Sequence, residues 1–159
     1  MKKITAILLI FIILVSLSAC RKQEIDPYKV LAKFETIVET LGNSQISKDS
    51  DLIGTRDNTD DNKYIGVYTS NCQNETGRDV IFGGASLKDQ SLRIFGNIKT
   101  DDGTATLRIR LGENIEFPEL DDNGNFDFIL SLNGGGNYIM IDYENFIGSV
   151  TLTSELSET

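Results

Sequence analysis

The sequence predicts a mainly β protein: an antiparallel β-sandwich of about seven or eight strands, preceded by one amphipathic helix. In several segments after residue 63, apolar and polar residues alternate one by one, as in strands with one buried face. Short connections rich in Asp, Asn and Gly join these segments. Such connections favour antiparallel neighbours, because parallel strands need a long crossover. A small antiparallel β-barrel is the alternative.

The first 19 residues have the layout of an export signal. Lys2 and Lys3 precede a stretch without charged residues that runs to Ala19, and Cys20 follows. The apolar run falls short of the roughly 20 residues that a membrane-spanning helix needs. The pattern therefore predicts a leader that is removed, rather than a membrane span.

The four residues LSAC, Leu17 to Cys20, resemble the lipobox of bacterial lipoproteins. The resemblance implies cleavage before Cys20, a diacylglyceryl group on its sulfur and acylation of the new amino group. Two or more acyl chains hold a protein stably at a bilayer, since each buried methylene contributes about 0.8 kcal/mol. The implied protein is exported and lipid-anchored to the cell membrane or the outer membrane. An uncleaved anchor with an incidental cysteine is the alternative.

Residues 26–42 predict the amphipathic helix. Asp26 suits its N-cap, Pro27 its first helical position and Gly42 its left-handed C-cap. Apolar residues repeat at three- and four-residue spacing, and they are Val30, Leu31, Phe34, Ile37, Val38 and Leu41. We expect this stripe to pack on the β domain, because the polar face lacks the basic excess of helices that lie on membranes.

The chain organisation follows from these segments. Residues 20–62 hold the lipidated N-terminus, the helix and, from residue 43, a polar and acidic linker or long loop. Residues 63–159 form the β domain. Its strand segments are YIGVYTS from Tyr64, DVIFGG from Asp79, SLRIFGNIK from Ser91, TATLRIRL from Thr104, NFDFILSL from Asn125 and SVTLTSE from Ser149. Its turn segments are DDG at 101–103, DNGN at 122–125 and NGGGN at 133–137.

Residues 92–153 carry a second resemblance. IFGNIKTDDG, DNGNFDFILSLNGGGNYIMID and GSVTL, in that order, are similar to the prealbumin-like β-sandwich modules of bacterial surface proteins. In those modules a glycine-marked turn precedes an aromatic-rich strand, and a strand of the Gly-x-Tyr type follows. The resemblance implies a spacer or a binding module rather than a catalyst, and it implies no functional residue.

The composition excludes several functions. The chain has no histidine, so Ser–His–Asp or Cys–His catalysis and histidine-ligated zinc are excluded. It has 24 acidic against 15 basic residues and a net charge of −9, which repels nucleic acid. Apart from Cys20 the only cysteine is Cys72, which we expect to be a small buried hydrophobe without a disulfide partner. We predict no catalytic residue and no cofactor.

One segment is a weak calcium candidate. Asp121, Asn123, Asn125 and Asp127 alternate as oxygen ligands do in a calcium loop. Gly124, however, is the fourth residue of the segment, whereas an EF-hand loop has its glycine at the sixth position. Asn-Gly between alternating segments is also a strong hairpin signal. We therefore favour a turn and predict no metal site.

Four tyrosines are candidates for an aromatic binding face. Tyr64 and Tyr68 are four residues apart in one strand segment and share a face, whereas Tyr138 and Tyr143 point to opposite faces. The alternation therefore disfavours a platform of four tyrosines, and a small aromatic patch is still allowed.

Together these features predict a non-catalytic, lipid-anchored envelope protein whose β-sandwich binds a protein or glycan partner at the cell surface. Exposed loops such as 133–137 are the expected contacts. One alternative is a carboxylate-based envelope hydrolase, which needs two acids that converge in a cleft. The other is a protective lipoprotein of the immunity or exclusion type, which small size and anchoring allow.

Overall fold

The structure is a computed structural model, and its chain divides into two compact units, Met1–Ala32 and Lys33–Thr159. Cys20 and the leader predicted over residues 1–19 lie outside the described residues, so lipidation stays a prediction. No helix in the described part is long and apolar enough to cross a membrane. The described residues are 29–30, 33–34, 36–37, 40, 42, 44–58, 62–86, 90–132 and 134–157.

The second unit is an antiparallel sheet of six strands in its described part, with one short 3-10 helix, η1 (Asp49–Asp51). The strands are β1 (Thr55–Asp57), β2 (Gly66–Ser86), β3 (Gln90–Leu111), β4 (Asn114–Glu116), β5 (Asn125–Leu132) and β6 (Gly135–Leu156). Hydrogen bonds order them β1-β2-β6-β3-β4. One edge of β3 pairs with β6 from Leu92 to Leu111. β4 and β5 therefore both pair with the other edge of β3, at its two ends. The sheet is not closed into a barrel.

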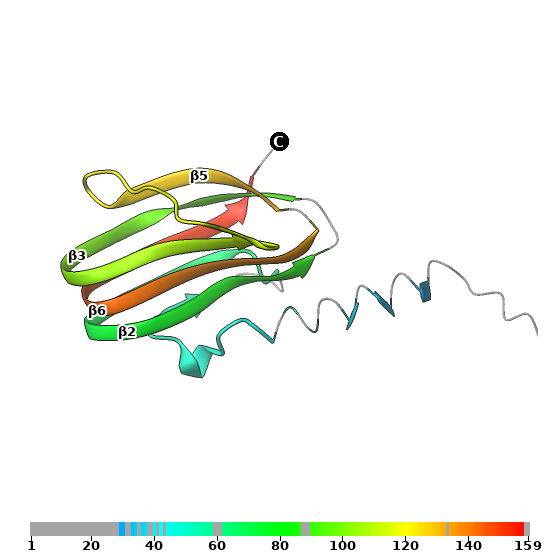
Figure 1. Cartoon of the computed structure of the whole chain (residues 1–159), viewed down its shortest axis with the longest axis horizontal. Helices are drawn as coiled ribbons and strands as arrows, with labels where there is room; N and C mark the ends of the chain where they lie inside the picture. The colour runs from blue at the N-terminus through cyan, green and yellow to red at the C-terminus, as the bar shows by residue number, and fades with distance from the viewer. Residues whose placement is uncertain are drawn as a thin grey trace, which may run out of the picture. The chain divides into compact units, whose positions relative to one another are not determined.

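The three central strands, β2, β6 and β3, bend together. Each has 21 or 22 residues, and the register between neighbours shifts near its middle. Each strand has at least one residue of positive φ near this place, among them Asn74 in β2 (126°), Gly103 in β3 (70°) and Asn145 in β6 (47°). Bulges and left-handed residues bend a strand sharply. The sheet therefore folds over on itself, and its two halves face each other (Figure 1).

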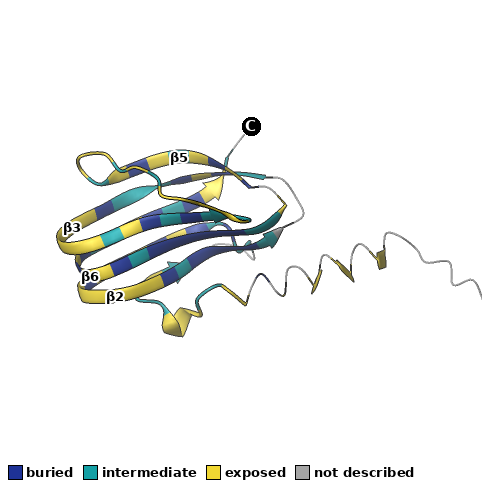
Figure 2. Ribbon diagram, in the orientation of Figure 1, coloured by how far each residue is buried: buried dark blue, intermediate teal, exposed yellow. Residues whose placement is uncertain are grey.

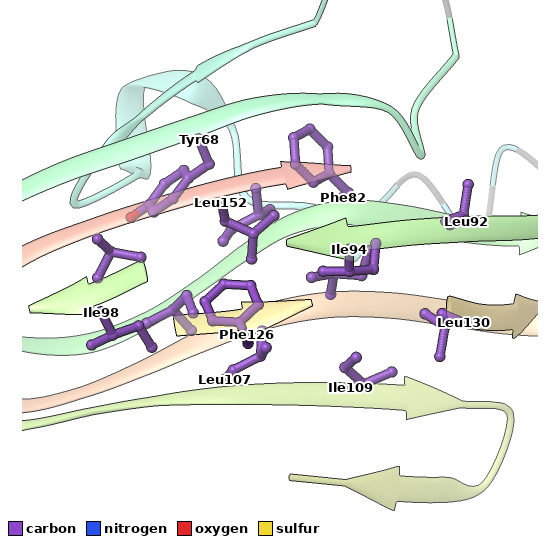
Figure 3. Packing of buried hydrophobic residues seen from close by; sticks show 14 of the residues in the cluster. Tyr68, Phe82, Leu92, Ile94, Ile98, Leu107, Ile109, Phe126, Leu130 and Leu152 are labelled. Atoms are coloured by element: carbon purple, nitrogen blue, oxygen red, sulfur yellow. The ribbon is translucent and has the colours of Figure 1, made fainter. Parts of the chain in front are cut away.

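The hydrophobic core lies between the two halves. Before the bend β2 supplies Tyr68 and Cys72, and after it Ile81 and Phe82, all of them buried. Residues from both halves meet in the same cluster (Figure 3). Exposed residues gather at the bend, while the straight parts of the long strands carry the buried ones (Figure 2). This sandwich-like arrangement confirms the predicted alternation, because every second side chain points between the halves.

The strand count differs from the predicted one because predicted neighbours merge. DVIFGG and all of YIGVYTS except Tyr64 and Ile65, which precede the strand, belong to β2. SLRIFGNIK and TATLRIRL both belong to β3. The DDG segment at 101–103, predicted as a connection, is the bend within β3. The chain does reverse there. The two arms of β3 do not pair with each other, however, because each pairs with β6.

The other predicted turns also join strands that do not pair. NGGGN at 133–137 leads from β5 to β6, and DNGN at 122–125 leads from the loop after β4 into β5. The tight hairpin between paired neighbours lies elsewhere, between β3 and β4. There Leu111 pairs with Asn114, and Gly112 adopts a φ of 62°. Turn residues in the sequence indicate where the chain turns. They do not indicate whether the strands on either side of the turn pair with each other.

The helix predicted over 26–42 is not confirmed, since most of its residues lie outside the described part. The few that are described have helical backbone. Phe34 and Ile37 belong to the apolar stripe, yet they are 55% and 56% exposed, so the expected packing of the stripe on the β domain is wrong for these two residues. Gly42 is helical and buried, and its carbonyl oxygen accepts a hydrogen bond from the Tyr138 hydroxyl at 3.2 Å.

Residues 44–58, which the sequence predicts as part of a linker, instead run along β2 and are called the edge segment below. Its strand β1 pairs with β2 before the bend. After the bend, the amide of Ser47 donates to the carbonyl of Val80 (3.1 Å), and the Val80 amide donates to Ser47 Oγ (3.0 Å). Nη1 of Arg56 donates to the carbonyl of Ile81 (2.6 Å). The edge segment therefore bonds to both halves of β2 and covers that edge.

Candidate functional site

An open groove of about 730 Å³ lies on the outer face of one half of the sheet. Its floor comes from β2 and β3 after their bends and from β6 before its bend. Phe117, in the loop between β4 and β5, belongs to the lining as well. The lining includes Arg78, Thr104, Thr106, Arg108, Phe117 and Asp142.

Strand periodicity places the polar side chains on this face. Arg78, Asp142 and Thr106 are direct neighbours across β2, β6 and β3. The next residue along β2, Asp79, and the next along β3, Leu107, are buried. Successive side chains of a strand point to opposite faces. The same three strands therefore carry the groove on one face and the core on the other.

Asp142 is the centre of the charges in the groove. Arg78 donates to both of its carboxylate oxygens, from Nε to Oδ1 and from Nη2 to Oδ2, the latter over 2.9 Å. Nη1 of Arg108 lies 3.5 Å from Oδ2. The hydrogen bond with Asp142 raises the pKa of Arg78. Paired donation of this kind fixes the plane of a guanidinium group, so Asp142 holds Arg78 firmly and makes a single, longer contact with Arg108.

Phe117 and Arg108 form the aromatic part of the groove. The centroid of the Phe117 ring is 5.5 Å from Cζ of Arg108, a cation–π distance. The Phe117 side chain is nonetheless 56% exposed. Nε of Arg108 is buried and, among the described residues, has no hydrogen-bond partner. The groove thus places an exposed aromatic ring beside a guanidinium group.

The charges that line the groove balance each other. The lining has two positive side chains, Arg78 and Arg108, and two negative ones, Asp142 and Glu144. The chain as a whole has a net charge of −9. Exposed hydroxyl groups come from Thr104 and Thr106. The surface therefore offers donors, acceptors and one apolar ring without a net charge.

The calcium candidate residues serve a turn and an ion pair. The Asp121 carboxylate accepts the backbone N–H groups of Asn123 and Asn125, both at 2.8 Å, and hydrogen bonds from Asn125 lower its pKa. Asp127 binds Arg93 at 2.7 Å, and this contact lowers the pKa of Asp127. In the described part of the chain, no group of three or more His, Cys, Asp or Glu side chains is placed to hold a metal ion.

The four candidate tyrosines are all buried, so they form no aromatic patch on the surface. Tyr68 and Tyr143 meet in the core, with their hydroxyl oxygens 2.8 Å apart. Tyr64 donates to the carbonyl of Gly84 at 2.8 Å, and Tyr138 bonds to Gly42 as described above.

Two other candidates from the sequence lie apart from the groove. Cys72 is 3% exposed and unpaired, as predicted, and burial raises its pKa. The described residues of the 133–137 loop, which begin at Gly134, do not line the groove. Sequence reasoning missed Phe117. The signal was the residue itself, a large aromatic side chain directly before Pro118 and outside every alternating segment.

Comparisons with known proteins give slight likenesses only. No family model and no curated protein matches the chain. A ruminal GH26 endo-β-1,4-mannanase superposes with a TM-score of 0.32 and 16% identity, over 58% of this chain and 18% of the mannanase, so the chain spans less than a fifth of that protein. A carbohydrate-binding module of Cellvibrio mixtus lichenase 5A, solved with cellotriose, gives a TM-score of 0.36 and 9% identity over 74% of this chain and 95% of the module. Likenesses this slight carry no argument about function.

Proposed function

We propose that the chain is an exported, lipid-anchored and non-catalytic envelope protein that binds a partner in the groove. The observation that carries the proposal is the composition of the groove. Asp142 fixes the guanidinium group of Arg78 and contacts that of Arg108, which lies against the exposed ring of Phe117. Oriented polar groups next to an exposed apolar surface are what a binding site requires. Groups fixed in advance also lose little conformational entropy when a partner binds.

The chemistry of the groove favours binding over catalysis. The chain has no histidine, so the remaining general acids and bases are chiefly carboxylates. The groove contains two carboxylates, Asp142 and Glu144. Since both oxygens of Asp142 accept hydrogen bonds from guanidinium groups, Asp142 is poorly placed to act as the acid of a hydrolase.

The anchor rests on the LSAC segment at 17–20 and is tested by labelling. We expect labelled palmitate to enter the wild-type chain and to be absent from Cys20→Ala, which should also keep its leader. Label on the variant would contradict the assignment.

The partner site is tested by photo-crosslinking. A photoreactive residue at Thr106, in the groove, should capture material from envelope extracts. The matched control is Thr151, an exposed threonine on β6 in the other half of the sheet. Equal capture from both positions, or none, would contradict a binding groove.

A further inference from the structure

We infer that the groove binds a neutral glycan, with one sugar ring packed on Phe117 and its hydroxyl groups bonded to Arg78, Arg108 and Asp142. This inference rests on the proposed function and names the chemical class of its partner.

Charge is the first argument. Two arginines in a groove usually point to a phosphate or carboxylate ligand. Here both guanidinium groups already face Asp142, and Glu144 adds a second negative charge to the lining. An anionic ligand would have to displace or approach these carboxylates, so the balanced charge favours a neutral ligand.

Hydrogen-bonding capacity is the second argument. The groove presents guanidinium donors, carboxylate acceptors and the exposed hydroxyl groups of Thr104 and Thr106. Each sugar hydroxyl donates one hydrogen bond and accepts others, so a lining with both donors and acceptors suits it.

The exposed ring is the third argument. Phe117 is 56% exposed although it is a large apolar residue. Sugar rings carry apolar C–H faces beside their hydroxyl groups, and such a face can cover an aromatic ring while the hydroxyls reach the polar floor. Arg108 lies against the ring at 5.5 Å, so the two parts of the site are adjacent.

The position of the groove disfavours an extended peptide. A peptide that adds a strand needs an open sheet edge with free N–H and C=O groups. The groove instead lies on the face of β2, β6 and β3, whose backbone groups are paired with one another. Recognition here must therefore come from side chains.

Isothermal titration of the full chain in detergent micelles tests the inference. The probes are short neutral oligosaccharides of glucose, mannose, galactose, xylose and N-acetylglucosamine, with oligogalacturonate and a sulfated glycan as anionic probes. We expect at least one neutral probe to bind. Phe117→Ala should weaken that binding about tenfold or more, equivalent to about 1.4 kcal/mol, and Phe117→Tyr should retain it.

Two further variants separate the site from the fold. Ile115→Ala removes another exposed apolar side chain, outside the groove, and should leave binding unchanged. Asp142→Asn keeps the shape of the side chain but removes the charge that orients Arg78 and contacts Arg108, and it should weaken binding as Phe117→Ala does. Urea midpoints would confirm that each variant is folded.

Three results would overturn the inference: no neutral probe binds, only the anionic probes bind, or Phe117→Ala and Asp142→Asn bind as the wild type does. Capture of a protein partner at Thr106, together with no glycan binding, would refute the glycan and leave the proposed function standing. Failure of both experiments would refute both.

Discussion

The hydroxyl of Tyr68 donates to Oδ2 of Asp79 at 2.5 Å, and Asp79 is fully buried between the two halves of the sheet. The same carboxylate accepts the backbone N–H groups of Ile53 (3.0 Å) and Gly54 (3.1 Å), both in the edge segment. Tyr68 lies before the bend of β2 and Asp79 after it. One buried carboxylate therefore joins the two halves and the edge segment, in a sandwich that no disulfide crosses.

Asp79→Ala should destabilise the protein strongly. The substitution leaves the Tyr68 hydroxyl and the amides of Ile53 and Gly54 without their acceptor. Loss of one partner from a buried charged network costs about 3–5 kcal/mol of unfolding free energy. Urea unfolding measures the loss. Asp57→Ala, at an exposed position on β1, is the control, and an equal loss in both variants would contradict the role of Asp79.

The protein should lose stability in alkaline solution. Burial raises the pKa of both Tyr68 and Tyr143 above the ordinary value of 10.0. A group with a raised pKa in the folded state stabilises fully below its unfolded pKa, and this contribution falls as the pH rises above that value. Urea midpoints should therefore decrease above about pH 10, together with the appearance of tyrosinate absorbance. Tyr143→Phe should show a shallower decrease, and a slope equal to that of the wild type would contradict this cause.

Arg56→Lys should loosen the edge segment. The guanidinium group of Arg56 donates to the carbonyls of Ile81 (2.6 Å) and Ser47 (3.0 Å), and a lysine lacks the fork that reaches both. We expect a loss of about 2 kcal/mol and faster hydrogen exchange at the amides of residues 53 and 54. Arg93→Lys, which alters an exposed ion pair, is the control and should change neither measurement by much.

Gly103→Ala should cost more than Gly112→Ala. Both glycines have left-handed backbone, with φ of 70° and 62°, so an alanine is strained by about 1–2 kcal/mol at either position. A Cβ on Gly103 would also lie 2.2 Å from the carbonyl oxygen of Asn145, whereas a Cβ on Gly112 would meet nothing within 4 Å. Thermal or urea unfolding of the two variants compares them. Equal losses would mean that close packing of β3 on β6 at the bend does not matter.

The placement of strands could be predicted, but their pairing could not. Alternation located β5 and the arms of β2 and β3, because the burial of one face leaves a trace in every second residue. Asp101, Asp102 and Gly103 correctly marked a reversal. Whether the two arms of β3 bond to each other or face each other across a core depends on β6, which lies far along the chain. No local pattern contains that information.

The candidate site was beyond prediction for the same reason. Arg78, Arg108, Phe117 and Asp142 come from three strands and a loop, and the three charged residues each read as ordinary surface residues. Their spacing in the sequence follows no motif. The calcium candidate, by contrast, was visible as a pattern, and the structure gives its side chains a turn and an ion pair instead.

The sequence by itself determined the mainly β character, the burial of Cys72 and the expectation of an exported lipid anchor, because these depend on composition and on neighbours along the chain. Tertiary structure alone decided that one sheet folds over on itself and that residues 44–58 cover its edge. It also decided that two arginines meet at Asp142 and that Phe117 lies against one of them. The physical reason is that backbone pairing between distant segments, rather than the nature of any single segment, sets which side chains share a face.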